Sequence, residues 1–115
     1  MNSTIKQKNR TQEIQYNLDG LILCKFEFNP QTGKLTKQIK FINKDQKTEE
    51  INYNDDGKTI KETIKYEYNS ETGKLTKQTK FNDKDKKTEE INYKSDGKTV
   101  DSTKKFNPET GQEIQ

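Results

Sequence analysis

The sequence has no histidine and a single cysteine, Cys24. One cysteine cannot form an intramolecular disulfide, and without histidine or a Cys spacing pattern the sequence predicts no metal site and no cofactor. Two paired carboxylates occur, Glu49–Glu50 and Glu89–Glu90, but neighbours in a strand point to opposite faces and do not suit joint acid and base work. No nucleophile, base and orienting group can be assembled from the remaining residues. We therefore expect no enzyme and no catalytic residues.

Apolar residues are also scarce, at 24% of the 115 residues against 36% charged. Such a composition is typical of disordered chains, because little apolar surface is available to offset the entropy of ordering. The few apolar residues nevertheless recur at regular intervals between turn residues, which favours a folded chain. The length fits one domain.

The charges nearly balance, with 22 basic and 19 acidic residues interspersed along the chain. A nucleic-acid binder usually has a basic stripe, so nucleic acid is not the expected partner. No apolar run is long enough to span a membrane, and Met1–Arg10 lacks the apolar centre of a secretory signal. The expected protein is soluble, either cytoplasmic or secreted with a signal already removed.

The chain contains a repeat, because the seven residues Thr32–Gln38 return at Thr72–Gln78. Laying Asn29–Tyr68 over Asn69–Pro108 matches roughly 25 of about 40 positions, a period at which repeat architectures are typical. The second copy is more polar, since Thr79 stands in the place of Ile39. A terminal repeat that loses apolar residues is typical of a capping end.

Turn signals separate short segments along the whole chain. One class ends in Asp-Gly, where both residues accept positive φ, and a second class reads Asn-x-x-Thr-Gly. The turn glycines of these two classes are Gly20, Gly33, Gly57, Gly73, Gly97 and Gly111. A third, glycine-free class occurs at Asn43–Gln46 and Asn82–Asp85.

Between the turns, apolar residues alternate with polar ones at period two, as in half-buried strands. Leu35, Ile39 and Phe41 are an example, with Thr36 and Lys40 on the other face. The sequence therefore predicts an all-β fold, an antiparallel meander of β-hairpin repeats that forms an open, twisted, largely single-layer sheet. A partly closed barrel is the alternative. The expected organisation is a flexible tail over 1–11 and a single repeat domain over 12–115, with copies at about 29–68 and 69–108.

Aromatic residues recur at corresponding places in successive strands, which predicts an aromatic face. Its members are Tyr53, Tyr66, Tyr68, Tyr93, Phe28, Phe41 and Phe81. A wider apolar face is expected from Leu35, Ile39, Phe41, Ile51, Tyr53, Ile60, Ile64 and Tyr66. These residues are either ordinary core or an interaction surface, because a contiguous exposed apolar patch marks a binding site. The expected partner is a protein or a second copy; the alternative is single-stranded nucleic acid stacked on the aromatic rings.

Two motifs carry a resemblance to a known family. Tyr68–Lys74 reads Tyr-Asn-x-x-Thr-Gly-Lys and Asp96–Thr99 reads Asp-Gly-Lys-Thr, with earlier copies at Phe28–Lys34 and Asp56–Thr59. These motifs resemble a repeat family of unknown function that is abundant in phytoplasmas, and more distantly tyrosine-aspartate repeats and hairpin-repeat antitoxins. The resemblance implies a hairpin-repeat fold without catalytic residues. The function we expect is a repeat-based protein interaction module, such as a bacterial effector or scaffold.

Overall fold

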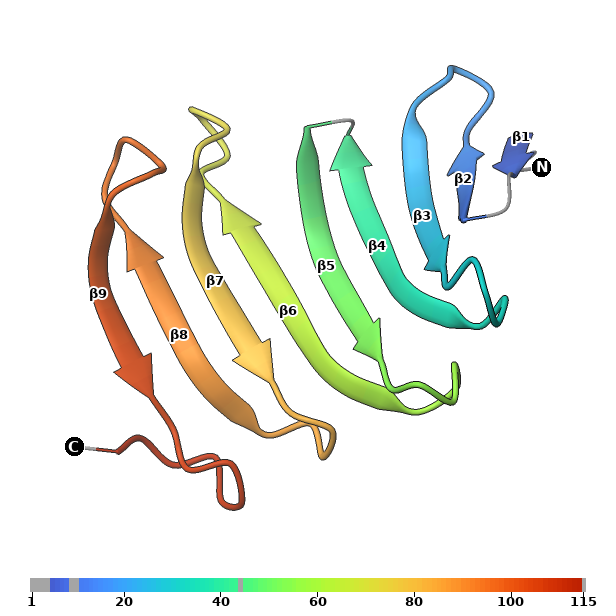
Figure 1. Cartoon of the computed structure of the whole chain (residues 1–115). Helices are drawn as coiled ribbons and strands as arrows, with labels where there is room; N and C mark the ends of the chain where they lie inside the picture. The colour runs from blue at the N-terminus through green and yellow to red at the C-terminus, as the bar shows by residue number, and fades with distance from the viewer. Residues whose placement is uncertain (1–4, 9–10, 44, 115) are drawn as a thin grey trace. The chain divides into compact units, whose positions relative to one another are not determined.

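The structure is a computed structural model that describes residues 5–8, 11–43 and 45–114. These residues divide into two compact units, Met1–Lys61 and Glu62–Gln115, and each unit is considered by itself. The strands of both units are labelled in Figure 1. The boundary between the units falls inside one strand, β6.

Unit 1 contains five strands, each paired antiparallel with the next in the sequence. They are β1 (Ile5–Lys8), β2 (Gln12–Tyr16), β3 (Ile22–Phe28), β4 (Leu35–Asn43) and β5 (Gln46–Tyr53). Unit 2 continues the same pattern with three further antiparallel pairs. Its strands are β6 (Ile60–Tyr68), β7 (Leu75–Phe81), β8 (Lys87–Tyr93) and β9 (Val100–Lys105).

The all-β meander predicted from the sequence is confirmed. Strand order follows sequence order, and within each unit every strand pairs only with its sequence neighbours, so the sheet of each unit is open instead of closed into a barrel. No helix occurs over 5–8, 11–43 and 45–114, so this part of the chain holds no helix with the length and apolarity needed to cross a bilayer. The short segments alternate at period two and lack a helical period, which explains why every element is a strand.

One expectation about organisation needs correction. Residues 5–8 were expected in a flexible tail, but they form β1, because Ile5 pairs with Tyr16 and Lys8 with Glu13. The single repeat domain expected over 12–115 stays a prediction, and its residues fall in the two units that meet at Lys61 and Glu62. Meander strands contact mainly their sequence neighbours, so a chain of hairpins can separate into units without any linker.

The Asn-x-x-Thr-Gly motif builds one class of turn. In the first copy, the side-chain Oδ1 of Asn29 accepts hydrogen bonds from the backbone N–H groups of Gln31 at 2.8 Å and Thr32 at 3.1 Å. Gly33 N–H then donates to the Asn29 carbonyl at 2.8 Å. The same bonds recur at Asn69 and Asn107. The motif is therefore a turn-building device that exploits the local hydrogen bonding of asparagine.

The Asp-Gly-Lys-Thr motif builds a second class of turn. The carboxylate of Asp56 accepts hydrogen bonds from the N–H groups of Lys58 at 2.9 Å and Thr59 at 3.0 Å, and from the Thr59 hydroxyl at 2.7 Å. Of its Asp-Gly pair, only the glycine has positive φ, at 71° for Gly57. These turns therefore differ from two-residue turns in which both central residues need positive φ.

The glycine-free turn uses an aspartate where the other turns use glycine. Asp85 has φ of 62°, and its N–H donates to the carbonyl of Asn82 at 3.0 Å. Asp tolerates the left-handed conformation better than most residues, which is why this turn forms without glycine. In the first copy, Lys44 of the corresponding turn lies outside the described residues.

Few side chains are buried. Among the described residues, Ile39 and Ile64 are the buried apolar residues, and Glu50, Thr79 and Glu90 are the buried polar ones. None has less than 2% of its surface exposed. A single layer of sheet has no interior, so burial is confined to the middle of each face.

Candidate binding surface

The strand register assigns side chains to two faces in unit 1. Residues opposite each other on neighbouring strands point to the same face. Phe26 lies opposite Gln38, and Gln38 lies opposite Ile51. The other face carries Ile39, which lies opposite Lys25 on one side and Glu50 on the other.

We call these the tyrosine face and the ionic face of unit 1. The tyrosine face includes Cys24, Phe26, Phe28, Leu35, Gln38, Ile51 and Tyr53, and it also carries one ion pair, Lys40 with Glu49. The ionic face includes Lys25, Glu27, Lys37, Ile39, Phe41, Lys47 and Glu50. Most side chains of both faces are half-buried, as expected for one layer of sheet.

Unit 2 has the same two kinds of face. Its tyrosine face includes Ile64, Tyr66, Tyr68, Leu75, Gln78, Ile91 and Tyr93. Its ionic face includes Lys65, Glu67, Lys77, Thr79, Phe81, Lys87 and Glu90. The repeat in the sequence therefore gives each unit a tyrosine face and an ionic face of its own.

The predicted aromatic set does not share one face. Phe41 lies opposite Lys47, and Phe81 lies opposite Lys87, both on ionic faces. The Nζ of Lys65 lies 5.2 Å from the centre of the Phe81 ring, within the range of a cation–π contact. Phe28 and Tyr53 lie on the tyrosine face of unit 1, and Tyr66, Tyr68 and Tyr93 lie on that of unit 2.

The prediction of one wider apolar face is wrong for a related reason. Leu35 and Ile39 were placed together by alternation, but a bulge puts one extra residue, Thr36, between the pairs Glu27–Lys37 and Phe28–Leu35. A bulge shifts the alternation by one residue, so Leu35 joins the tyrosine face and Ile39 the ionic face. Period-two alternation predicts which residues of one strand share a face. Turns and bulges decide which side chains of the neighbouring strands lie on that same face.

A small hollow lies at one end of the tyrosine face of unit 1. Its volume is about 300 Å³, and its lining combines the turn that follows β3 with the end of β5. The lining residues are Asn29, Thr32, Lys34, Leu35, Thr36, Tyr53, Asn54 and Asp55. The hollow therefore joins one aromatic ring and one leucine to several polar groups of the turns at the ends of β3 and β5.

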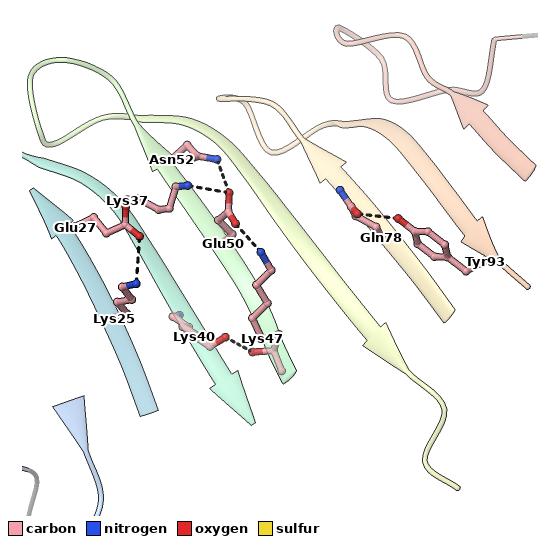
Figure 2. A network of polar contacts seen from close by, with 10 residues as sticks. Lys25, Glu27, Lys37, Lys40, Lys47, Glu50, Asn52, Gln78 and Tyr93 are labelled. Atoms are coloured by element: carbon pink, nitrogen blue, oxygen red, sulfur yellow. Dashed lines mark hydrogen bonds and ion pairs between the residues drawn. The ribbon is translucent and has the colours of Figure 1, made fainter. Parts of the chain in front are cut away.

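The tyrosine ring beside the hollow is held by a glutamine. The Tyr53 hydroxyl donates to Gln38 Oε1 at 3.2 Å, and Gln38 Nε2 donates to the Cys24 sulfur at 3.4 Å. In unit 2 the Tyr93 hydroxyl donates to Gln78 Oε1 at 3.1 Å, as Figure 2 shows. Sequence reasoning missed both glutamines. Each glutamine lies fifteen residues before its tyrosine, and this repeated spacing was the sequence feature that could have identified both pairs.

The ionic face of unit 1 is organised around Glu50. Lys47 Nζ lies 3.2 Å and Lys37 Nζ 3.6 Å from its carboxylate, and Asn52 Nδ2 donates to it at 3.3 Å (Figure 2). Burial opposes ionisation of Glu50, but the hydrogen bond and charge of Lys47 and the charge of Lys37 outweigh it and lower the pKa below 4.5. The carboxylate of Glu50 is thus charged, and Lys37, Lys47 and Asn52 supply its ion pairs and hydrogen bond.

Glu90 has the corresponding role in unit 2. The hydrogen bond from Asn92 is the main cause of a pKa lowered from 4.5, and the charges of Lys77 and Lys87 add to it. The neighbouring Glu89 lies opposite Lys80, whereas Glu90 lies opposite Thr79. The two carboxylates therefore point to opposite faces. No group of three metal-binding side chains occurs in the part of the chain that the structure describes.

The motif glycines also bring turns together within each unit. A Cβ added to Gly57 would lie 2.9 Å from Lys34 Cβ and 3.2 Å from Leu35 N. A Cβ added to Gly97 would lie 2.9 Å from Lys74 Cβ. The Asp-Gly-Lys-Thr turn thus packs against the Thr-Gly-Lys segment of a neighbouring turn. The two sequence motifs are therefore in contact within each unit, and this close packing accounts for the glycine of the Asp-Gly-Lys-Thr motif.

The strands and turns define an all-β protein of consecutive antiparallel hairpins, and its two turn motifs build and pack the turns. The chain belongs to the family described as a protein of unknown function (DUF2963), whose model matches residues 5–40 and 79–115, more than half of the chain. A search of curated proteins found no match to the chain.

Comparison with solved structures supports the same architecture. The chain is similar to part of the crystal structure of TarM, with a TM-score of 0.52 and 12% sequence identity. The aligned region covers 97% of this chain and 21% of that one, so this chain spans about a fifth of the length of TarM. At this identity the likeness concerns the fold alone.

Proposed function

We propose that the chain is a non-enzymatic protein interaction module that binds a protein partner or a second copy through the tyrosine faces of its units. The observation that carries the proposal is the small amount of burial. Ile39 and Ile64 are the buried apolar residues of the described chain, and each unit is one layer of sheet. The rings and aliphatic side chains of a tyrosine face therefore keep apolar surface that a partner can cover.

The ionic faces are less suited to binding. Their lysines are engaged by glutamates, as in the contacts of Lys37 and Lys47 with Glu50 and of Lys87 with Glu90. This pairing also weighs against the alternative of single-stranded nucleic acid, since phosphate binding needs available positive charge. The resemblance to phytoplasma repeats adds the finer proposal of a bacterial effector or scaffold.

A pair of matched double variants tests the tyrosine faces. Tyr53→Lys with Tyr93→Lys changes the same position of both copies on the tyrosine faces. Phe41→Lys with Phe81→Lys changes one ring in each copy on the ionic faces. Light scattering across a concentration series, with and without a candidate partner, measures association, and circular dichroism with a urea transition checks folding.

We expect the tyrosine variant to stay folded and to lose association, and the phenylalanine variant to associate as the wild type does. A wild type that remains monomeric and captures no partner, together with tyrosine variants that merely unfold, would show that these rings are ordinary core. Association that weakens steeply with added salt and requires single-stranded nucleic acid would favour the alternative instead.

A further inference from the structure

The hollow at the end of the tyrosine face of unit 1 lies where two turns pack against each other. Its lining comes from the turn between β3 and β4 and from the chain that leaves β5. A Cβ added to Gly57 would lie 2.9 Å from Lys34 Cβ, so the second turn fits closely against the first. The Tyr53 hydroxyl is held by Gln38 at 3.2 Å. The hollow is therefore formed before any ligand arrives, as ligand sites usually are.

Most polar groups of the lining are already used by the turns. Thr36 Oγ1 donates to the Glu27 carbonyl at 3.1 Å. Asn54 Nδ2 donates to Thr59 Oγ1 at 2.9 Å. Asp55 differs from both, because it is exposed and its carboxylate has no hydrogen bond and no ion pair with any residue that the structure describes. This carboxylate is therefore available to a ligand.

The charges around the hollow are not balanced. Lys34 also lines the hollow, but it lies close enough to Asp56 for the two charges to attract each other. Lys34 and Asp56 therefore compensate each other, and the negative charge of Asp55 remains. An occupant with a positive charge is favoured over a neutral or a negative one.

Unit 2 repeats the frame of the hollow with a different charge. The same lysine, leucine and tyrosine recur there as Lys74, Leu75 and Tyr93. The charge of this lysine is likewise attracted by the aspartate of the Asp-Gly-Lys-Thr turn. However, Lys94 stands in the place of Asn54. Ser95 stands in the place of Asp55. The remaining charge is therefore positive in unit 2 and negative in unit 1, although the turns are alike.

The available groups of the hollow suit a guanidinium group on an aliphatic stem. A guanidinium is planar and always charged, and it forms paired hydrogen bonds with a carboxylate such as that of Asp55. It also stacks on aromatic rings more often than an ammonium does, and Tyr53 supplies a ring. Leu35 supplies apolar surface for the stem.

We propose that the hollow of unit 1 binds an alkylguanidinium group, with the charged end at Asp55 and the stem against Leu35 and Tyr53. The group comes either from a free organic cation or from an arginine side chain of a peptide. The corresponding place in unit 2 lacks the carboxylate and does not bind the group. The inference does not rest on association through the tyrosine faces, because the site is complete within unit 1.

NMR chemical shifts of the whole chain, followed during titration, test the site with three probes. N-butylguanidinium is the free cation, acetyl-Gly-Arg-Gly-amide is the peptide form, and N-butylurea resembles the first probe in shape but has no charge. We expect both guanidinium probes to shift the signals of Leu35, Tyr53 and Asp55 and to leave those of the corresponding residues of unit 2 unchanged. Butylurea should bind at least about three-fold more weakly than butylguanidinium. Tighter binding of the peptide than of butylguanidinium assigns the site to an arginine side chain, and equal binding assigns it to a free cation.

Two variants copy the residues of one unit into the other. Asp55→Ser gives unit 1 the serine of unit 2, where the same turn forms with Gly97 N–H donating to the Lys94 carbonyl at 2.9 Å. This variant is therefore expected to stay folded, as checked by circular dichroism, and to bind butylguanidinium at least about three-fold more weakly. Lys94→Asn with Ser95→Asp makes the reverse exchange and is expected to create a second site, seen as new shifts at Tyr93.

Four results would each overturn the proposal. They are the absence of shifts in unit 1, equal shifts in the two units of the wild type, butylurea that binds as tightly as butylguanidinium, and binding that Asp55→Ser leaves unchanged. A double variant of unit 2 that gains no second site would also overturn it, because the frame of the hollow and the carboxylate would then not be enough to bind the group.

Discussion

Ile39 in β4 and Thr79 in β7 occupy the same place in the two copies, yet their burial does not follow their polarity. Ile39 is 8% exposed and Thr79 is 6% exposed. Each lies between a lysine and a glutamate of the neighbouring strands, Lys25 and Glu50 for Ile39, and Lys65 and Glu90 for Thr79. The long aliphatic stems of lysine and glutamate cover the residue between them. In this one-layer sheet, the place of a residue in the sheet decides how far its side chain is buried. The apolarity of the side chain decides only how much that burial stabilises the fold.

The largest expected effect concerns the turns that the two copies share. Gly57→Ala and Gly97→Ala each force alanine into a positive φ and place its Cβ 2.9 Å from a lysine Cβ. We expect each to lower the free energy of unfolding by about 2–4 kcal/mol, measured by urea denaturation. Gly33 also has positive φ, but nothing lies within 4 Å of an added Cβ. Gly33→Ala should therefore cost only about 1–2 kcal/mol, and equal losses at Gly33 and Gly57 would contradict the packing of turn against turn.

The next effect exchanges the buried residues themselves. Ile39→Thr should lower the free energy of unfolding by about 1–2 kcal/mol, because it removes apolar surface from a covered position. Thr79→Ile should raise it by up to about 1 kcal/mol, because the same cover already exists in unit 2. Ile42→Asn copies another difference between the repeats at a residue that is 61% exposed, and serves as the control. If Ile42→Asn lowered the free energy of unfolding as much as Ile39→Thr does, the buried position of residue 39 would not explain the effect of Ile39→Thr.

A smaller effect depends on pH and should be alike in the two units. Hydrogen bonds from Lys58 and Thr59 N–H lower the pKa of Asp56 from 3.8 to about 2, and those from the Thr99 hydroxyl and the Lys98 N–H do the same for Asp96. A lowered pKa in the folded state stabilises the fold above pH 3.8, and this stabilisation is lost as the pH falls from 3.8 to about 2.

Urea denaturation over this pH range measures the loss. Asp56→Asn and Asp96→Asn should each flatten the dependence of stability on pH by a similar amount, because asparagine does not titrate. The double variant should flatten it further. A pH profile that neither variant changes would mean that the turn aspartates do not carry this part of the acid sensitivity.

Sequence reasoning reached the strands and most turns because both depend on local residues. Alternation predicts each strand from its own side chains, and glycine or asparagine marks the place where the chain must reverse. The prediction of one aromatic face across several strands failed at Phe41 and Phe81, because register depends on turn geometry and on the bulges at Thr36 and Thr76. The opposite faces of the paired glutamates were predicted, but the burial of Glu50 and Glu90 was not, because a charged residue gives no apolar signal.

The finest comparison between the copies is the hydrogen bond of each tyrosine to its glutamine. Tyr53→Phe and Tyr93→Phe each remove one hydroxyl and should lower the free energy of unfolding by about 0.5–1.5 kcal/mol. Gln38 also donates to the Cys24 sulfur, whereas Ile64 stands at the place in β6 that Cys24 has in β3. A sulfur acceptor is weak, so we expect the two losses to agree to within about 0.5 kcal/mol. A clearly smaller loss for Tyr53→Phe, which Cys24→Ala then restores to the size of the Tyr93→Phe loss, would show that the cysteine holds Gln38 in place and that the two tyrosine sites are not equivalent.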